Sequence, residues 1–412
     1  VVSVLEYDLV FDGVGAKGMV FVGALQAFEA EGHTPGRLLG TSAGAITAAL
    51  LAAGYTSDEM LAALAEREGE RSVFAGFMGV PEAPDKAALQ TSATRDLLRR
   101  LNLPFVPDGF EEKLDDWLIE WMAAQPGLRH VISFIERGGW YSADNFLKWL
   151  RRRLDSGSFK GAPRAFSGLR LAEFHAATGV HLSLVASDVT AQQMLVLNHQ
   201  TAPRLPVVMA VRMSMSIPLL WQEVIWDADW GPYRVGSGPE RDLTGHAIVD
   251  GGLLSNFPLE LLVSSDERVT AVMGPKSGAR VLGMLIDEAQ AVPGADEAAT
   301  RAAPPSGGLR LGQLQTIQRL GNLVNTTLSA RDKMVIETFE NLVVRLPARG
   351  YGTVEFDMTD ERRERLVAAG REVMAAYLEQ RAAEPVSFAF GPEAERARDT
   401  ADKVALKALG GW

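Results

Sequence analysis

The chain has 412 residues, of which 47% are hydrophobic and 23% are charged, as in an ordinary globular protein. Its 52 acidic and 41 basic residues give a net charge of −11, which argues against nucleic acid as the main partner because phosphate binding requires a basic surface. The absence of cysteine excludes disulfides, zinc–thiolate sites and a thiol nucleophile.

The N-terminal part of the chain alternates between strand and helix patterns. Apolar periodicity predicts a strand over 6–12, a helix over 18–31, a short buried strand over 37–40 and a helix over 43–54. This alternation is typical of an α/β protein with a parallel sheet. A chain of this length forms either two domains or one enlarged α/β unit.

The rest of the chain divides by its patterns into three parts. Residues 65–135 show no strong strand signal, and we expect a helical insertion at about 61–137 within a catalytic domain that spans 1–290. The stretch 291–308 is rich in Ala, Pro and Gly and predicts a flexible loop, and 309–412 predicts a mainly helical C-terminal region packed on the catalytic domain. The individual elements expected are strands at 180–190, 193–199, 247–252, 279–287 and 340–346, helices at 57–67, 92–102, 142–154, 309–338 and 359–381, and a polar tail.

The first short motif is Gly13-x-Gly15-x-x-Gly18, between the first strand and the first helix. A glycine turn in this position is typical of a dinucleotide-binding loop, which also requires an acidic residue at the end of the second strand. The second strand ends instead in a serine motif. The glycine turn is therefore better interpreted as a set of backbone amides that bind another anion, such as an oxyanion.

The second motif, Gly40-Thr41-Ser42-Ala43-Gly44, lies between a buried strand and a helix. In this context G-x-S-x-G is the pattern of a nucleophile elbow, in which a strained serine stands clear of the sheet near a helix N-terminus. The flanking residues must be small to admit that backbone conformation. Ser42 is therefore the candidate nucleophile.

A nucleophilic serine needs a base, and a triad in the α/β-hydrolase order would place a histidine late in the chain. The six histidines are His33, His130, His175, His181, His199 and His246, so none follows position 246. His246 oriented by Asp188 is one alternative. The preferred base is Asp250, which ends a strand and precedes two glycines, because we expect it at the same sheet edge as Ser42. Burial would raise the basicity of its carboxylate.

Three elements now stand in order along the chain: Asp12 to Gly18, Gly40 to Gly44, and Asp250 to Gly252. Together they resemble the patatin-like phospholipase family. The segments 185–221 and 249–260 are also similar to family sequence, so the resemblance covers roughly 5–60 and 138–290 and, more loosely, 356–378. One departure is Val14, where the family usually has glycine.

The resemblance implies a fold and a reaction. The fold is a three-layer α/β/α sandwich with a mainly parallel central sheet. The reaction is hydrolysis of acyl esters through an acyl-enzyme, with Ser42 as nucleophile and Asp250 as general base in a catalytic dyad.

The resemblance also implies roles for the first glycine loop. Backbone amides of Gly13, Val14, Gly15 and Ala16 would form the oxyanion hole. Val14 is β-branched and resists a positive φ, so its amide would have to be placed without a left-handed turn. Lys17 would steady the loop or bind the phosphate of a lipid substrate.

We therefore predict a lipid acyl hydrolase of phospholipase A or lysophospholipase type, with no metal or other cofactor. A calcium loop of the D-x-D-x-D-G type does not occur in the sequence. A neutral-lipid lipase or an acyltransferase with the same dyad is the alternative within acyl chemistry. A catalytically silent scaffold of the same fold and a nucleotide-dependent enzyme that uses the glycine loop are alternatives of other classes.

The expected partner is a phospholipid or lysophospholipid substrate, met by transient contact with a membrane surface. No apolar run approaches the roughly 18 residues of a membrane span, and no signal peptide is visible. We expect a cytoplasmic protein, with membrane association or export without a signal peptide left open.

Several apolar residues are candidates for the lipid entrance. Trp117, Trp121 and Met122 share one helical face, and this face and the segment 74–80 either form a lid or pack on the core. Three tryptophans follow a segment at which the family lines its acyl site, and one of them is expected to line an acyl channel: Trp221, Trp226 and Trp230.

Overall fold

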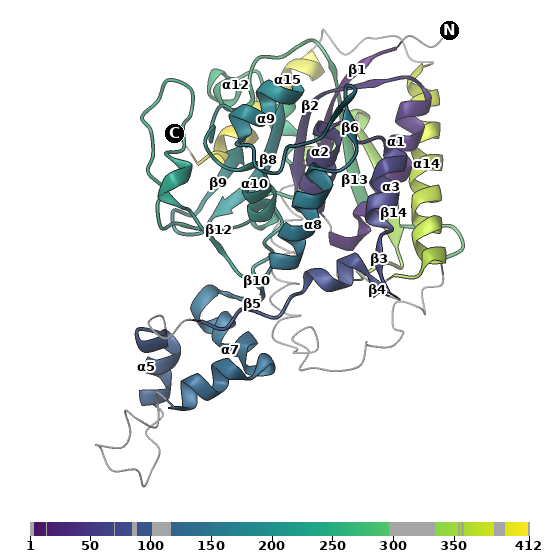
Figure 1. The fold of residues 1–412 in the computed structure, drawn as a ribbon. Coiled ribbons are helices and arrows are strands. Elements are labelled where there is room, and N and C mark those ends of the chain that lie inside the picture. The colour runs from purple at the N-terminus through teal and green to yellow at the C-terminus, as the bar shows by residue number, and fades with distance from the viewer. Residues whose placement is uncertain are drawn as a thin grey trace.

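The computed structural model describes residues 4–13, 15–69, 71–84, 89–100, 117–295, 334–352, 355, 358–382 and 392–410. These residues build a mixed β-sheet with helices on both faces (Figure 1). The strands of this sheet are β1 (Glu6–Phe11), β2 (Thr34–Thr41), β8 (Leu182–Asp188), β9 (Gln193–Leu197), β11 (Val224–Ile225), β12 (Ala247–Asp250), β13 (Arg280–Ala291) and β14 (Val343–Arg349). The predicted fold class, a three-layer α/β/α sandwich with a mainly parallel sheet, is confirmed.

The strand order is β11-β12-β8-β2-β1-β13-β14, and β9 pairs with β8 outside this path. The run β8-β2-β1-β13-β14 is parallel. In contrast, β9 and β12 are antiparallel to β8, and β11 is antiparallel to β12. The carboxyl ends of the parallel strands share one edge of the sheet, which we call the carboxyl edge, and their amino ends share the opposite amino edge.

Alternate residues along the central strands face the two helical layers. In β1, Leu9 and Phe11 belong to the larger of two hydrophobic cores and Val10 belongs to the smaller one. In β2, Leu38 faces the larger core and Leu39 faces the smaller. All five side chains are buried, as expected for parallel strands that are covered on both faces.

The two helical layers enclose these cores. The larger core is covered by α1 (Met19–Ala30), α2 (Ala43–Ala52), α3 (Ser57–Leu64), α8 (Asp144–Leu154), α9 (Leu171–Thr178), α10 (Val207–Ser214) and α14 (Asp360–Ala382). The smaller core is covered by α11 (Glu260–Val263), α12 (Glu267–Met273) and α15 (Pro392–Ala408). Helices α1 and α14 touch along their backbones, because a Cβ atom at Gly23 would lie 1.8 Å from the carbonyl oxygen of Val367.

The stretch between α3 and α8 first packs on the larger core through Val73 and Phe77, and its helical second half forms a small lobe with an apolar cluster of its own. It contains β3 (Arg67–Glu68), β4 (Arg71–Ser72), the 3-10 helix η2 (Val73–Phe77), α5 (Ala93–Arg100), α7 (Pro126–Arg137) and β5 (Gly139–Tyr141). Helices α5 and α7 stand apart from the sheet and its two layers (Figure 1). Residues 117–124 are helical and pack, through Ile119 and Ala123, against Leu89 and Ile132.

Short elements complete the described chain. They are η1 (Gly15–Gly18), β6 (Ser158–Phe159), β7 (Ala162–Pro163), β10 (Leu219–Trp221), η3 (Ala228–Trp230), η4 (Gly251–Leu253) and η7 (Glu340–Leu342). The C-terminal region differs from the predicted elements in two respects. The polar tail contains helix α15, and β14 pairs with β13 and so belongs to the central sheet. Most of the predicted loop at 291–308 and of the predicted helix at 309–338 lies outside the described residues.

Candidate active site

Ser42 stands on the tight turn between β2 and α2, at the carboxyl edge of the sheet. Its backbone has φ 52° and ψ −118°, a conformation that costs a residue with a side chain about 1–3 kcal/mol. Both flanking glycines are required, because a Cβ at Gly40 would lie 2.4 Å from the carbonyl oxygen of Gly44, and one at Gly44 would lie 2.3 Å from that of Phe11. The Ser42 amide donates to Ser214 Oγ at 3.1 Å and so holds the turn in place. The geometry is that of a nucleophile elbow.

Asp250 reaches this turn by a route that differs from the predicted one. Strand β12 runs antiparallel to β8, so its carboxyl end points away from the carboxyl edge, and the predicted reason for the meeting was wrong. Because β9 occupies one side of β8, β12 shares the other side with β2. There Thr41 pairs with Val185, and Asp250 pairs with Ala186, the next residue of β8. The ends of β2 and β12 therefore meet head to head, which brings Ser42 and Asp250 together.

The Asp250 carboxyl is buried, and its Oδ1 accepts a hydrogen bond of 2.7 Å from the Gly252 amide. The turn that follows Asp250 packs closely on β8, since a Cβ at Gly251 would lie 2.4 Å from the carbonyl oxygen of Val185. Burial raises the pKa of Asp250 from 3.8 to about 7, and hydrogen bonding by Ser42 and by the Gly252 amide opposes that rise. The contact with Ser42 is looser than a well-formed hydrogen bond, because Oδ2 has no partner of good geometry among the described residues. A carboxylate with this pKa suits general-base catalysis at neutral pH.

The glycine loop lies against the elbow. A Cβ at Gly13 would lie 3.0 Å from the carbonyl oxygen of Thr41 and 3.1 Å from Ser42 Cβ. The Gly13 amide, however, donates to Asp12 Oδ1 at 2.8 Å, so this amide is already engaged, contrary to the oxyanion role predicted for it. Gly15 and Ala16 line the same pocket as Ser42. These two residues are therefore the better candidates within the described part of the loop.

Two other loop residues have predicted roles. Val14 lies outside the described residues. Lys17 is buried and forms an ion pair with Glu288 of β13. It does not belong to the described lining of the Ser42 pocket, so the predicted contact of Lys17 with a lipid phosphate has no support in this geometry. The ion pair instead ties the loop to the sheet, which fits the other predicted role of Lys17, steadying the loop.

A pocket opens beside Ser42, and its wall is mainly apolar. The apolar lining consists of Met19, Ile46, Leu64, Phe74, Phe77, Met215, Ile217, Trp221 and Met358. Glu355 and Arg363 add charged groups to the same lining. An apolar wall with a few polar groups is typical of a site that orients an apolar ligand beside a reactive group.

The aromatic residues considered for the lipid entrance fall in different places. Trp221 lines the pocket. Trp226 is buried elsewhere, where its Nε1 donates to the carbonyl oxygen of Gly231 at 3.0 Å, and the half-buried ring of Trp230 packs against it. The segment 74–80 contributes two pocket-lining phenylalanines, so this part of the insertion belongs to the wall of the site.

Trp117 and Trp121 do not pack on the core. They are 60% and 45% exposed, and their rings stack with centroids 6.5 Å apart. Met122 packs instead against the small apolar cluster of the lobe. The tryptophan pair is thus an exposed apolar patch on the lobe. Within the part of the chain that the structure describes, no helix combines the length and the apolar character needed to cross a bilayer.

His246 pairs with Asp188, as the alternative with a histidine base requires. Its Nδ1 lies 2.8 Å from Asp188 Oδ2. His246 precedes Asp250 by four residues, however, which is about 13 Å in an extended strand. It does not line the Ser42 pocket. The geometry therefore favours the carboxylate over the imidazole as the partner of Ser42.

Sequence reasoning missed residues that reach the site from outside the motifs. The Ser214 hydroxyl donates to the carbonyl oxygen of Val185 at 2.6 Å while it accepts from the elbow amide, so it links the elbow to β8. Glu355, Met358 and Arg363 reach the pocket from the C-terminal region. No spacing rule connects these positions with Ser42, so only the folded chain reveals them.

Among the described residues, one group of three or more His, Cys, Asp or Glu side chains could hold a metal ion. It consists of His175, His181 and His199. His181 precedes β8 and His199 follows the antiparallel β9, so the group lies at the amino edge of the sheet. It is therefore separate from the Ser42 pocket at the carboxyl edge.

Comparison with known proteins gives a family and a relative. The family model described as patatin-like phospholipase matches residues 9–263, a range that contains Ser42 and Asp250. The chain is also 27% identical over 380 residues to the uncharacterized protein YqhO of Bacillus subtilis (strain 168). That alignment covers 90% of this chain and 98% of YqhO.

Two solved structures are similar at low sequence identity. VipD from Legionella pneumophila matches with a TM-score of 0.42 and 17% identity, over 91% of this chain and 67% of VipD. ExoU of Pseudomonas aeruginosa, in its complex with SpcU, matches with a TM-score of 0.37 and 17% identity, over 98% of this chain and 59% of that chain. The chain thus spans about three fifths of the length of ExoU.

Proposed function

Because the chain belongs to the patatin-like phospholipase family, we propose that it is a phospholipase A or lysophospholipase that works through a Ser42–Asp250 dyad. Members of this family are lipid acyl hydrolases. The observation that supports the dyad is the head-to-head meeting of β2 and β12, which brings a serine in a strained turn beside a buried carboxyl. The raised pKa of Asp250 supports the same assignment, because it makes this carboxylate a stronger base than an exposed one.

In the first half of the proposed reaction, Ser42 Oγ attacks the carbonyl carbon of an acyl ester while its proton passes to the Asp250 carboxylate. The carbonyl π pair moves onto oxygen and gives a tetrahedral oxyanion. When this intermediate collapses, the bond to the alcohol oxygen breaks and that oxygen takes the proton from Asp250. The products are acyl-Ser42 and a free alcohol or lysolipid.

In the second half, water replaces Ser42 as the nucleophile. Asp250 accepts a proton from the water as its oxygen attacks the acyl carbon, and collapse of the intermediate returns that proton to Ser42 Oγ. A fatty acid leaves and the dyad is restored. One carboxylate is sufficient because it gives back in each half-reaction the proton that it has accepted.

The oxyanion of both intermediates requires hydrogen-bond donors beside Ser42. We assign this role to the amides of Gly15 and Ala16, which line the pocket at the start of η1. Helix α1 follows η1 directly, so the positive end of its dipole adds to the stabilisation. The apolar wall of the pocket, from Met19 to Met358, supports a fatty acyl chain as the group that is bound there.

A labelling experiment tests the dyad. Wild-type protein should react with a fluorophosphonate probe at Ser42 and should hydrolyse p-nitrophenyl esters. Ser42→Ala should lose both properties, and Asp250→Asn should lose turnover by at least about 1,000-fold. His246→Ala is the matched control and should keep turnover, because its imidazole has no part in the dyad. Retained turnover in Asp250→Asn, or its loss in a folded His246→Ala protein, would contradict the proposal.

Product analysis separates the alternatives. Mass spectrometry should detect fatty acid released from phosphatidylcholine or lysophosphatidylcholine. Release from triacylglycerol alone would indicate a neutral-lipid lipase, and ester formation with an added alcohol would indicate an acyltransferase. Folded wild-type protein that the probe does not label would indicate a catalytically silent scaffold, and a thermal shift caused by NAD or ATP would indicate a nucleotide-binding loop.

The same proposal includes transient contact with a lipid surface through Trp117 and Trp121. Their exposure and their position on the lobe support this contact, since apolar rings at a membrane interface contribute about 25 cal/mol per Å² of buried area. The double change Trp117→Ala and Trp121→Ala should lower hydrolysis of lipid in vesicles several-fold and leave turnover of a soluble ester unchanged. Ile225→Ala, at another exposed apolar residue, is the control and should change neither rate.

A further inference from the structure

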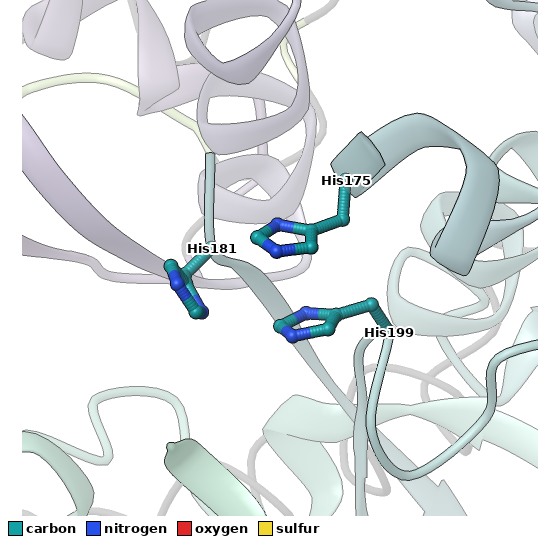
Figure 2. A group of neighbouring side chains, drawn as sticks. All are labelled: His175, His181 and His199. Atoms are coloured by element: carbon teal, nitrogen blue, oxygen red, sulfur yellow. The ribbon is translucent and has the colours of Figure 1, made fainter. Parts of the chain in front are cut away.

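Three histidines that are far apart in the sequence converge at the amino edge of the sheet (Figure 2). His175 extends from the last turn of α9, His181 immediately precedes β8, and His199 follows β9. Each offers one ring nitrogen to a set in which all three nitrogens lie within 4.8 Å of one another. The His175 and His199 rings are stacked with centroids 3.8 Å apart, and the His181 ring faces them at 4.6 and 4.9 Å.

The backbone beneath these rings is fixed. The carbonyl oxygen of His181 accepts from the Leu38 amide at 2.9 Å, within the pairing of β2 and β8. The turn that carries His199 is closed by Asn198 Oδ1, which accepts from the amides of Gln200 and Thr201 at 2.9 and 3.0 Å. His181 is therefore held by strand pairing and His199 by a closed turn, and neither lies on a loop that is free to move.

Among the described residues, the hydrogen bonds around the three rings leave one nitrogen of each ring without a protein partner or with its other nitrogen as the donor. His175 Nδ1 lies 2.9 Å from the carbonyl oxygen of Val180, and because a carbonyl only accepts, Nδ1 is the donor and Nε2 is the nitrogen left to bind a metal. A histidine ligand typically donates its other ring nitrogen to such a partner. Within the described part of the chain, the buried Nδ1 atoms of His181 and His199 have no hydrogen-bond partner. Each of these two rings thus has a nitrogen that the surrounding protein does not satisfy.

The cluster lies in a partly buried setting that lowers the pKa values of two of its rings. Burial, and then the nearness of His175 and His181, lower the pKa of His199 to about 4. Burial lowers the pKa of His181, and His175 and Arg37 act in the same direction, while Asp8 opposes them. The positive charge of Arg37 is balanced by Asp8, with which it pairs at 2.6 Å.

We propose that His175, His181 and His199 form a binding site for a divalent transition-metal ion of the zinc type. Three imidazole ligands suit zinc and its neighbours in the first transition row, and they leave a fourth position for water or an anion from solvent. Metal–nitrogen bonds of about 2.1 Å need nitrogens about 3.4 Å apart in a tetrahedral site. The three nitrogens lie within 4.8 Å of one another, so they must draw closer, and the stacked His175 and His199 rings must turn until both lone pairs point at one ion.

The consequence is a cross-link between three elements of the fold. The ion ties α9, the start of β8 and the end of β9 together at the edge opposite Ser42. Because a metal that binds only the folded chain stabilises it by mass action, its effect should be seen in thermal stability. The site is independent of the proposed hydrolase, since none of its residues lines the Ser42 pocket.

The test uses full-length protein from which any histidine tag has been removed and which has been treated with a chelator and then desalted. Titration with ZnCl₂ in a calorimeter should give saturable binding of one ion per chain, and a few degrees of thermal stabilisation at 100 times the dissociation constant. CoCl₂ should give the intense visible d–d bands of a four-coordinate ion. The Ser42→Ala protein should bind equally well, so this result does not depend on the proposed activity.

Variants of the cluster decide the assignment. His175→Gln and His199→Gln should each weaken zinc binding by at least roughly 100-fold, more than is usual for loss of an outer hydrogen-bond partner. His130→Gln, at a half-buried histidine outside the cluster, is the matched control and should bind as the wild type does. His175→Cys keeps a ligand atom, so it should retain binding and add a thiolate charge-transfer band with cobalt. Absence of saturable binding to the wild type, or unchanged binding in the two glutamine variants, would overturn the proposal.

Discussion

The two edges of the central sheet each bury an aspartate, but they treat its carboxylate in opposite ways. At the amino edge, Asp8 is almost fully satisfied: Oδ1 accepts from the Arg37 amide at 2.7 Å, and Oδ2 accepts from Arg37 Nε and Nη2 at 2.9 and 2.6 Å. At the carboxyl edge, Asp250 receives one amide bond and a loose contact from Ser42, and faces no cation among the residues that act on its pKa.

The difference shows where the fold leaves a carboxylate free to act as a base. A guanidinium beside a buried carboxylate favours the ionised form and holds its geometry, so Asp8 serves the structure. The burial of Asp250 without such a partner makes ionisation costly and therefore makes the carboxylate basic. Incomplete satisfaction of Asp250 is thus the feature that separates the candidate active site from a structural ion pair.

Replacing each aspartate by asparagine should give the largest and most divergent effects. Asp250→Asn should lower kcat by at least about 1,000-fold and leave the protein as stable as the wild type or more so. Asp8→Asn should leave kcat of the folded protein within a few-fold of the wild type, but should lower the free energy of unfolding by about 3–5 kcal/mol, because Arg37 is left buried and unpaired. Ester turnover and urea denaturation measure the two effects.

The comparison between the two edges fails if these effects are exchanged. A strongly destabilised Asp250→Asn protein would mean that this carboxylate has a structural partner like that of Asp8. Loss of kcat in a folded Asp8→Asn protein would mean that the ion pair at the amino edge controls the geometry of the active site.

Both members of the proposed dyad could be predicted from the sequence, but for reasons of different quality. The elbow at Ser42 follows from local chemistry, since glycines at positions 40 and 44 are required by the backbone contacts around it. Asp250 was predicted as the base because it follows a strand and precedes two glycines. That strand, β12, was expected to be parallel to its neighbours, but it is antiparallel to β8. The register that brings Asp250 level with Ala186 depends on β9 occupying the other side of β8, and no local pattern contains that information.

Features that depend on distant segments could not be predicted. The Lys17–Glu288 ion pair and the pocket wall at Met358 join parts of the chain that are hundreds of residues apart. The histidines at 175, 181 and 199 have no spacing typical of a metal motif, because an α-helix, a strand start and a strand end bring them together. The alternation of strands and helices predicted the layers of the fold, whereas the sheet order decided what meets at its two edges.

The pH dependence of turnover should sharpen the contrast between the two aspartates. The pKa of Asp250 is raised to about 7, and the carboxylate must be ionised to act as a base, so kcat/KM should rise with pH and reach a plateau above about 7. At pH 5 the rate should be about 100-fold below the plateau, since each unit below the pKa lowers the ionised fraction tenfold. A pH-stat assay with an ester that does not titrate measures this profile. A midpoint near 4 would show that the working base is not a buried carboxyl.

The same pKa shift predicts that the stability of the wild type falls as pH rises, whereas its turnover rises. Protonated Asp250 is favoured in the folded state, with a pKa near 7 against 3.8 when exposed, so its contribution to stability is fully present below about 4 and is lost as pH rises through 7. Asp250→Asn has no carboxyl to ionise at this position. Its free energy of unfolding should therefore improve relative to wild type between pH 4 and pH 8, by roughly 1–4 kcal/mol. A constant difference between the two proteins across that range would contradict the raised pKa.

The smallest expected effect concerns strain at Ser42, which has no counterpart among the residues of the Asp8–Arg37 pair. A residue at φ 52° and ψ −118° with a side chain is strained by about 1–3 kcal/mol, and glycine is not. Both Ser42→Ala and Ser42→Gly should be inactive. The comparison between them therefore concerns only how the backbone strain at position 42 affects stability.

Glycine also gives the unfolded chain more freedom, which opposes folding by about 0.5–1 kcal/mol relative to alanine. Relief of strain outweighs this entropic cost, so Ser42→Gly should be more stable than Ser42→Ala by about 1 kcal/mol in urea denaturation. Ala62→Gly, at an exposed position of helix α3, makes the same chemical change without strain and should be destabilising by about 1 kcal/mol. If both glycines destabilise equally, the turn at Ser42 stores no strain, and the contrast between the two sheet edges rests on Asp250 alone.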